Sequence, residues 1–101
     1  MANPVDTKFE VTESCDVLVK KGYPVFQARI TVVLAEPSRK LPEAGRHWVQ
    51  SVNVPEIRIV GSESELEAFR ALPTKLADRV VREFLRIGFD RGVTEMKARA
   101  L

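Results

Sequence analysis

The apolar residues of this chain change their spacing once along its length, and that change limits the folds available to it. Between residues 9 and 60 they mostly alternate with polar residues, a period typical of half-buried strands. From residue 66 to residue 88 they recur every three or four positions, as on an amphipathic helix. With 101 residues, the order predicts one α+β domain in which three strands precede the helices.

Two of the predicted strands flank a turn. The first begins at Phe9, and the second runs from about Val25 to Ala35. The intervening residues 20–24 (KKGYP) are rich in turn formers and predict a hairpin. The buried side of the second strand is expected to comprise Phe26, Ala28, Ile30, Val32 and Leu34.

The third predicted strand follows a polar loop over residues 36–46 and runs from Trp48 to about Val60. Its apolar residues change parity near Pro55, so we expect a bulge or bend at residues 54–55. Proline cannot donate a ladder hydrogen bond, which favours an edge position for this strand.

A helix start is marked by a capping box, formed either by Ser62 with Glu65 or by Ser64 with Glu67. The first helix is short, because Pro73 breaks it, kinks it or opens the next one. The second helix is expected to continue to about Ile87. Either of two glycines, Gly88 or Gly92, could end it.

The predicted fold is a three-stranded antiparallel meander (β-β-β-α-α). Its short and long C-terminal helices pack on one sheet face. Residues 1–8 are expected to form a flexible arm and residues 9–92 the single domain. Residues 93–101 are a tail that either adds a helical turn or frays.

Four cations, Lys75, Arg79, Arg82 and Arg86, lie in the predicted long helix at spacings of four, three and four residues. At about 100° per residue they fall within an arc of roughly 60°, and we call them the basic ridge. The opposite side is expected to pack on the sheet. Its members are Leu76, Ala77, Val80, Val81, Phe84 and Gly88.

The ridge has a simple interpretation as the solvated side of an amphipathic helix, partly neutralised by Asp78 and Glu83. As a functional surface it could bind an acidic protein or the phosphates of nucleic acid. The loop over 36–46 could extend that surface. It contributes Arg39, Lys40 and Arg46.

A single long helix covers only one face of a small sheet, so the other face needs a partner or water. That second face is more apolar than a wetted surface requires, which predicts a homodimer contact. Trp48 is the expected centre of this contact, because tryptophan is enriched at interface hot spots. The residues assigned to the contact are Leu18, Val25, Val33, Trp48 and Val49.

Residues suited to catalysis or metal binding are sparse. His47 and Cys15 are the one histidine and the one cysteine, and they make no zinc-ligand set. Cys15 is expected to be a buried thiol, and His47 to face solvent. The acidic positions over 63–67 suit a helix N-terminus rather than a calcium loop. We therefore expect no catalytic residue, metal or cofactor, and a protein that is not an enzyme.

The net charge of +2 is too small to indicate a nucleic-acid or membrane partner by itself. One cysteine permits no internal disulfide, and no apolar run resembles a signal peptide or membrane span, so a cytoplasmic location is expected. The first functional hypothesis is a small homodimeric interaction module that presents its basic ridge to a protein. The alternative is sequence-tolerant nucleic-acid binding through the ridge and the 36–46 loop.

Overall fold

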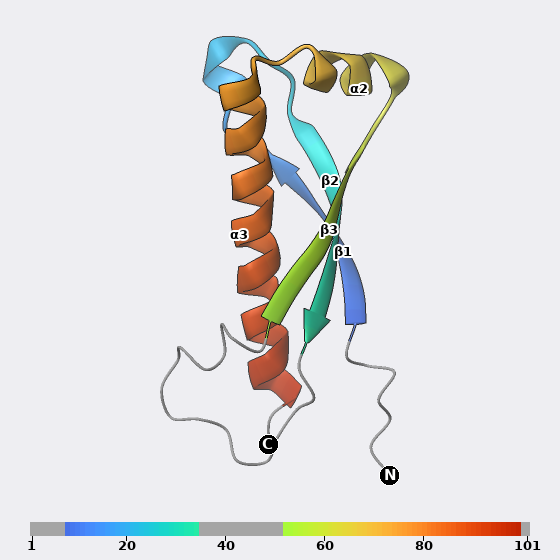
Figure 1. Cartoon of the computed structure of the whole chain (residues 1–101), viewed down its shortest axis with the longest axis vertical. Coiled ribbons are helices and arrows are strands. Elements are labelled where there is room, and N and C mark those ends of the chain that lie inside the picture. The colour runs from blue at the N-terminus through green and yellow to red at the C-terminus, as the bar shows by residue number, and fades with distance from the viewer. Residues whose placement is uncertain (1–7, 35–51, 100–101) are drawn as a thin grey trace.

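The computed structural model describes residues 8–34 and 52–99, which form one antiparallel sheet followed by two helices (Figure 1). This order confirms the predicted β-β-β-α-α fold. The elements are β1 (Lys8–Cys15), the 3-10 turn η2 (Val19–Lys21), β2 (Phe26–Leu34), β3 (Val52–Val60), α2 (Glu63–Arg70) and α3 (Thr74–Arg99). The residues assigned to the arm and to the 36–46 loop lie outside the described ranges, apart from Lys8.

The sheet has the order β1-β2-β3, with β2 in the centre and antiparallel to both neighbours. Helix α3 packs on one face and contacts all three strands. Helix α2 lies across one end of the sheet, where β2 begins and β3 ends (Figure 1). There the ring of Phe69 meets the ring of Phe26 edge to face, with 5.4 Å between their centroids. Helix α2 therefore closes the end of the core.

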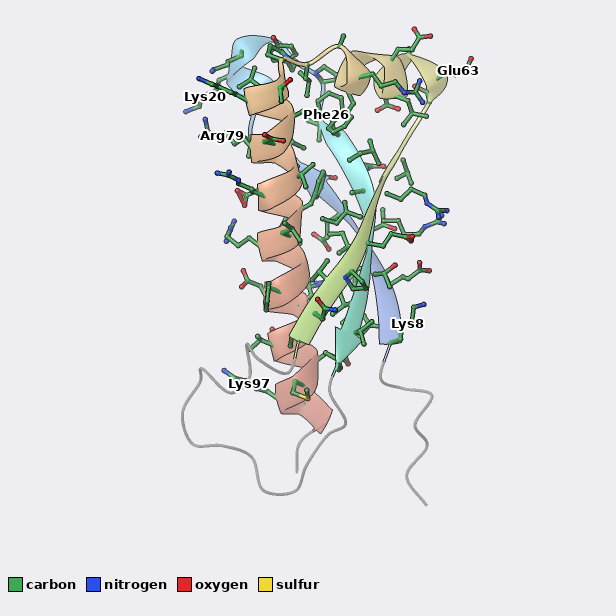
Figure 2. All side chains as sticks on the ribbon, viewed as in Figure 1. Lys8, Lys20, Phe26, Glu63, Arg79 and Lys97 are labelled. Carbon is green, nitrogen blue, oxygen red and sulfur yellow. The ribbon has the colours of Figure 1, made fainter. Side chains whose placement is uncertain are left out.

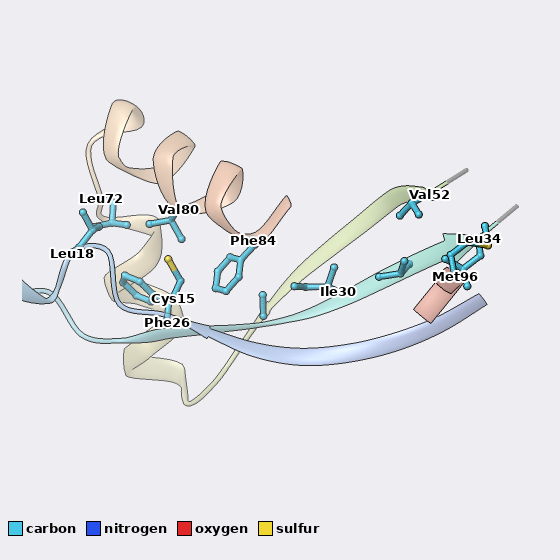
Figure 3. Packing of buried hydrophobic residues seen from close by; sticks show 12 residues of the cluster. Cys15, Leu18, Phe26, Ile30, Leu34, Val52, Leu72, Val80, Phe84 and Met96 are labelled. Carbon is cyan, nitrogen blue, oxygen red and sulfur yellow. The ribbon is translucent and has the colours of Figure 1, made fainter. Parts of the chain in front are cut away.

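The core is built on the alternation of β2, whose five inward residues are all buried, as predicted (Figure 3). Beside them lie residues of β3, the β1–β2 connection and α3, so one cluster runs the length of the domain. Its buried members are Cys15, Leu18, Phe26, Ala28, Ile30, Val32, Leu34, Val52, Leu72, Val80, Phe84 and Met96.

The expected irregularity in the third strand is a β-bulge. Thr31 pairs with Glu56 and Val33 with Asn53, so residues 54–55 of β3 lie opposite one residue of β2. The bulge reconciles the two parities in the sequence, because one extra residue turns the following side chains to the other face. Strand β3 is also an edge strand, as its proline indicated.

The connection between β1 and β2 differs from the predicted turn over residues 20–24. The chain leaves β1 earlier and forms η2, in which the amides of Lys21 and Tyr23 both donate to the carbonyl of Leu18. Gly22 closes this turn at φ 84°, a conformation that favours glycine. The tight turn directs Leu18 into the core, where it is 2% exposed. The assignment of Leu18 to the outer sheet face was therefore wrong.

The capping box at the start of α2 is the one formed by Ser62 and Glu65. The Glu65 amide donates to the Ser62 hydroxyl at 3.3 Å, and the Ser62 amide donates to the Glu65 carboxylate at 2.9 Å. The hydrogen bond from the Ser62 amide is the main cause of a lowered pKa of the Glu65 carboxyl, and the Ser62 side chain adds to the effect. Pro73 directly precedes α3, and its carbonyl accepts from two amides of the first turn.

Helix α3 is longer than the sequence predicts, because neither glycine ends it. A methyl group on Gly88 would lie 2.8 Å from Cγ2 of Ile30, and one on Gly92 would lie 3.0 Å from Cγ1 of Val32. The glycines therefore serve as close contacts between helix and sheet instead of helix stops. Residues 93–99 of the expected tail continue the same helix.

The buried side of α3 follows a four-residue spacing. Four residues turn an α-helix by about 400°, so each successive buried residue is displaced by roughly 40° around the axis. The line of contact thus winds around the helix, as packing on a twisted sheet requires. Its members are Val80, Phe84, Gly88, Gly92 and Met96.

Replacing Gly92 with alanine should lower the free energy of unfolding by up to about 2 kcal/mol. Overpacking in a close contact typically costs about 1–3 kcal/mol, and this cost exceeds the gain of about 1 kcal/mol in helix propensity. Urea denaturation followed by circular dichroism measures the change. Thr94→Ala, at an exposed position in the same helix, is the control and should leave stability unchanged or slightly higher. Stabilisation by Gly92→Ala would contradict the close-contact role.

Candidate functional site

The basic ridge lies on the first half of α3, and all four of its side chains are exposed (Figure 2). On the opposite side of the helix, Val80 and Phe84 are buried as expected. Val81 departs from the expectation and is 36% exposed. It lies at the margin of the predicted apolar side, about 100° around the helix from its buried neighbour Val80.

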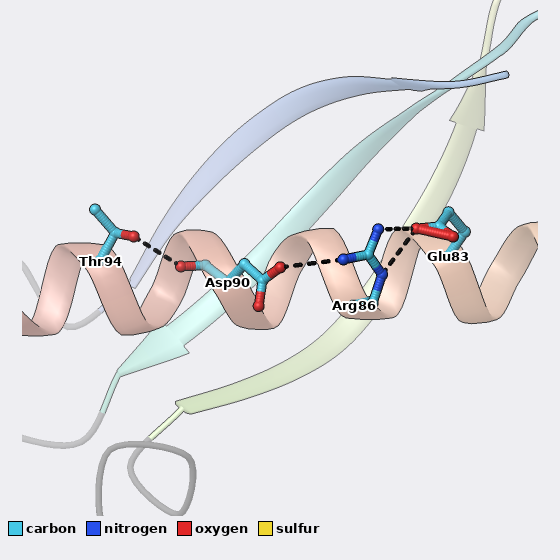
Figure 4. A network of polar contacts seen from close by, with 4 residues as sticks. All are labelled: Glu83, Arg86, Asp90 and Thr94. Atoms are coloured by element: carbon cyan, nitrogen blue, oxygen red, sulfur yellow. Dashed lines mark hydrogen bonds and ion pairs between the residues drawn. The ribbon is translucent and has the colours of Figure 1, made fainter. Parts of the chain in front are cut away.

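Arg86 differs from the rest of the ridge because acidic neighbours on its own helix bind it (Figure 4). Its Nε donates to the Glu83 carboxylate at 2.9 Å, and its Nη1 lies 3.5 Å from Oδ2 of Asp90. The hydrogen bond that Arg86 donates to Glu83, together with the negative charge of that carboxylate, raises the pKa of Arg86. Arg86 therefore has local anionic partners and offers less to an external one.

Lys75, Arg79 and Arg82 form no ion pair with any residue in the described ranges. Together with Asp78 they line a surface hollow of about 430 Å³. The suggested neutralisation of Arg82 by Asp78 is thus not seen as an ion pair within that part of the chain. Three cations around one carboxylate leave an excess of positive charge.

The structure places two further cations near the ridge, although they are distant from it in the sequence. Lys20 and Lys21 lie on η2, which sits beside the first turns of α3 (Figures 1 and 2). The contact is anchored by Leu18, which packs near Val80 in the core (Figure 3). No sequence spacing links the two segments. We call Lys20, Lys21, Lys75, Arg79 and Arg82 the basic end surface.

The other residues proposed for partner binding, Arg39, Lys40 and Arg46, lie outside the described residues. Their contribution to the basic end surface stays a prediction.

The sheet face opposite α3 is more polar than the sequence predicts. Val33 is half-buried there, and Val60 joins it from β3. Val25 is 41% exposed but lies just before β2. Trp48 and Val49, which were assigned to the same contact, lie outside the described residues. Most other side chains on this face are charged or hydroxylated.

The remaining candidate chemistry is limited in the described part of the chain. Cys15 is buried as expected, and burial raises the pKa of its thiol, with Glu83 and Asp16 adding to the effect. No group of three or more metal-ligating side chains occurs among the described residues. His47 lies outside these ranges.

Comparisons with known proteins do not assign the chain to a family. Neither the protein-family models nor the curated proteins nor the solved structures contained a match to it. In residues 8–34 and 52–99, no helix is both long enough and apolar enough to cross a bilayer.

Cys15 should react with a disulfide reagent at least tenfold more slowly in the folded protein than in urea. Burial limits access, and the raised pKa lowers the fraction of reactive thiolate at neutral pH. The rate of thionitrobenzoate release from Ellman's reagent measures this difference. Equal rates in the folded and unfolded protein would contradict a buried thiol.

Proposed function

We propose that this protein is a small, non-enzymatic interaction module of the cytoplasm. It works as a homodimer and binds an acidic protein partner through the basic end surface. The observation that carries the proposal is the set of three ridge cations without an ion pair in the described chain, joined by two lysines of η2. Exposed cations without intramolecular partners attract anionic groups and guide their approach.

Two exposed apolar side chains favour a protein over a nucleic acid as the partner. Val81 and Leu85 are each 36% exposed and lie one turn apart on α3, next to Arg82. Protein interfaces combine apolar contacts with a polar rim, whereas single-strand binders need exposed aromatic rings for base stacking. The matching ligand is an acidic amphipathic helix. Its leucines would pack against Val81 and Leu85, and its carboxylates would pair with the cations of the basic end surface.

The test is binding of a synthetic 20-residue helical peptide in which Leu recurs every three or four positions and Glu fills the flanks. Arg79→Gln with Arg82→Gln should weaken binding roughly tenfold, because each exposed charge contact contributes up to about 1 kcal/mol. Fluorescence anisotropy at low salt measures the affinity. Arg86→Gln with Lys97→Gln removes the same charge from the same helix and should have a smaller effect.

Three outcomes of this experiment would count against the proposal. Absence of peptide binding at low salt would exclude an acidic helical partner. Equal losses in the two double variants would show that position on the helix does not matter. Tighter binding to a 20-nucleotide single strand than to the peptide would favour the nucleic-acid function instead.

A further inference from the structure

We propose that the sheet face opposite α3 binds a second copy of this chain face to face, with the strands of the two copies running in opposite directions. This inference rests on the homodimer of the proposed function, but it does not depend on the basic end surface. It replaces the apolar contact expected from the sequence with a contact specified by charge.

The face is a regular grid, because the register of the three strands is known. Every second residue of β2 points to it, with one partner from β1 and one from β3. From one end of the sheet to the other, its four rows are Ser14–Gln27–Val60, Thr12–Arg29–Arg58, Glu10–Thr31–Glu56 and Lys8–Val33–Asn53.

The two middle rows carry opposite charges. Arg29 and Arg58 form the arginine row, and Glu10 and Glu56 form the glutamate row beside it. All four side chains are exposed. The face therefore presents a positive band next to a negative band, both running across the strands.

The arginine row is unfavourable within one copy, because like charges directly opposite each other on neighbouring strands repel. The Nη2 atom of Arg58 lies 3.7 Å from Oε1 of Glu56 on the same strand. This ion pair is exposed, so its stabilising effect is small. Arg29 forms no ion pair in the described ranges. A partner that brings carboxylates to this row would relieve the repulsion.

A second copy supplies those carboxylates in one orientation only. A two-fold axis that runs across the strands between the two bands places each arginine row on the other copy's glutamate row. Arg29 then faces Thr31 of the second copy, with a carboxylate on either side. An axis parallel to the strands would instead place arginine on arginine. The charge pattern thus selects the antiparallel arrangement.

The centre of the grid is suited to such a contact. Thr31 is only 5% exposed although it points to the open face, and its hydroxyl donates to Glu10 at 3.4 Å. Its surroundings are therefore already ordered. The same axis places the row that contains Val60 in one copy on the row that contains Val33 in the other. Val60 on β3 then lies one strand away from the partner's Val33 on β2.

The size of the face limits the strength of the dimer. Strands about 4.8 Å apart with a rise of about 3.4 Å per residue give a grid of roughly 14 by 27 Å. Stable interfaces bury about 800 Å² per partner, so this contact lies at the small end. The expected dimer is weak, depends on protein concentration and loosens at high salt.

The test exchanges the charges of one row at a time and measures self-association by sedimentation equilibrium. Arg29→Glu with Arg58→Glu should raise the dissociation constant at least tenfold, and so should Glu10→Arg with Glu56→Arg. An equimolar mixture of the two variants should form a heterodimer, because each then carries the charge that the other lacks. If charge reversal unfolds the chain, the milder pair Arg29→Gln with Arg58→Gln replaces it. This pair should also weaken association.

The control is Arg70→Glu with Lys97→Glu, which makes the same change in charge at exposed positions of α2 and α3 and should leave self-association unaltered. A wild-type protein that stays monomeric at several hundred micromolar would overturn both this inference and the homodimer, whereas peptide binding tests the basic end surface separately. A dimer that survives the row exchanges would overturn this face as the contact. Failure of the mixed variants to associate would overturn the pairing of the rows.

Discussion

The close contact of α3 with β2 and β3 at Gly88 and Gly92 is the constraint on which the rest of the structure depends. Both glycines leave too little space for a methyl group beside the valine and isoleucine side chains of the sheet. The helix axis is therefore held near the strands at the middle of the domain. With the position of the helix set there, the four-residue line of contact determines which side chains are buried at either end.

That same winding contact confines the basic ridge to one end of α3. The direction of the ridge, continued along the helix, passes from Arg86 to Val93, which packs against the core. Beyond Arg86, the exposed side of α3 carries Asp90 and Thr94. The Nη2 atom of Arg91 lies 3.2 Å from Oε2 of Glu13 on β1. Positive charge therefore gathers near η2, while the opposite end of the helix is electrostatically mixed.

Local signals in the sequence predict much of this fold. The alternation in β2, the parity change at Pro55, the Ser62–Glu65 box and the exposure of the ridge each depend on residues near one another in the chain. The predictions of a helix end at Gly88 or Gly92 and of an outward position for Leu18 were wrong, and both concern places where two distant segments meet. Glycine is common both after helices and in close contacts, and only the sheet opposite α3 distinguishes the two roles. The burial of Leu18, and with it the position of the lysines on η2, likewise depends on α3.

The bulge at residues 54–55 also determines how copies of this sheet can meet. An edge strand offers its unpaired amides and carbonyls to any extended chain, which is a common route to aggregation. On β3 that edge is broken in the middle, since the bulge bends the strand and Pro55 has no amide hydrogen to donate. A continuous ribbon needs a regular edge on both sides of the sheet, so lateral growth is thereby blocked along β3, although β1 keeps a regular edge.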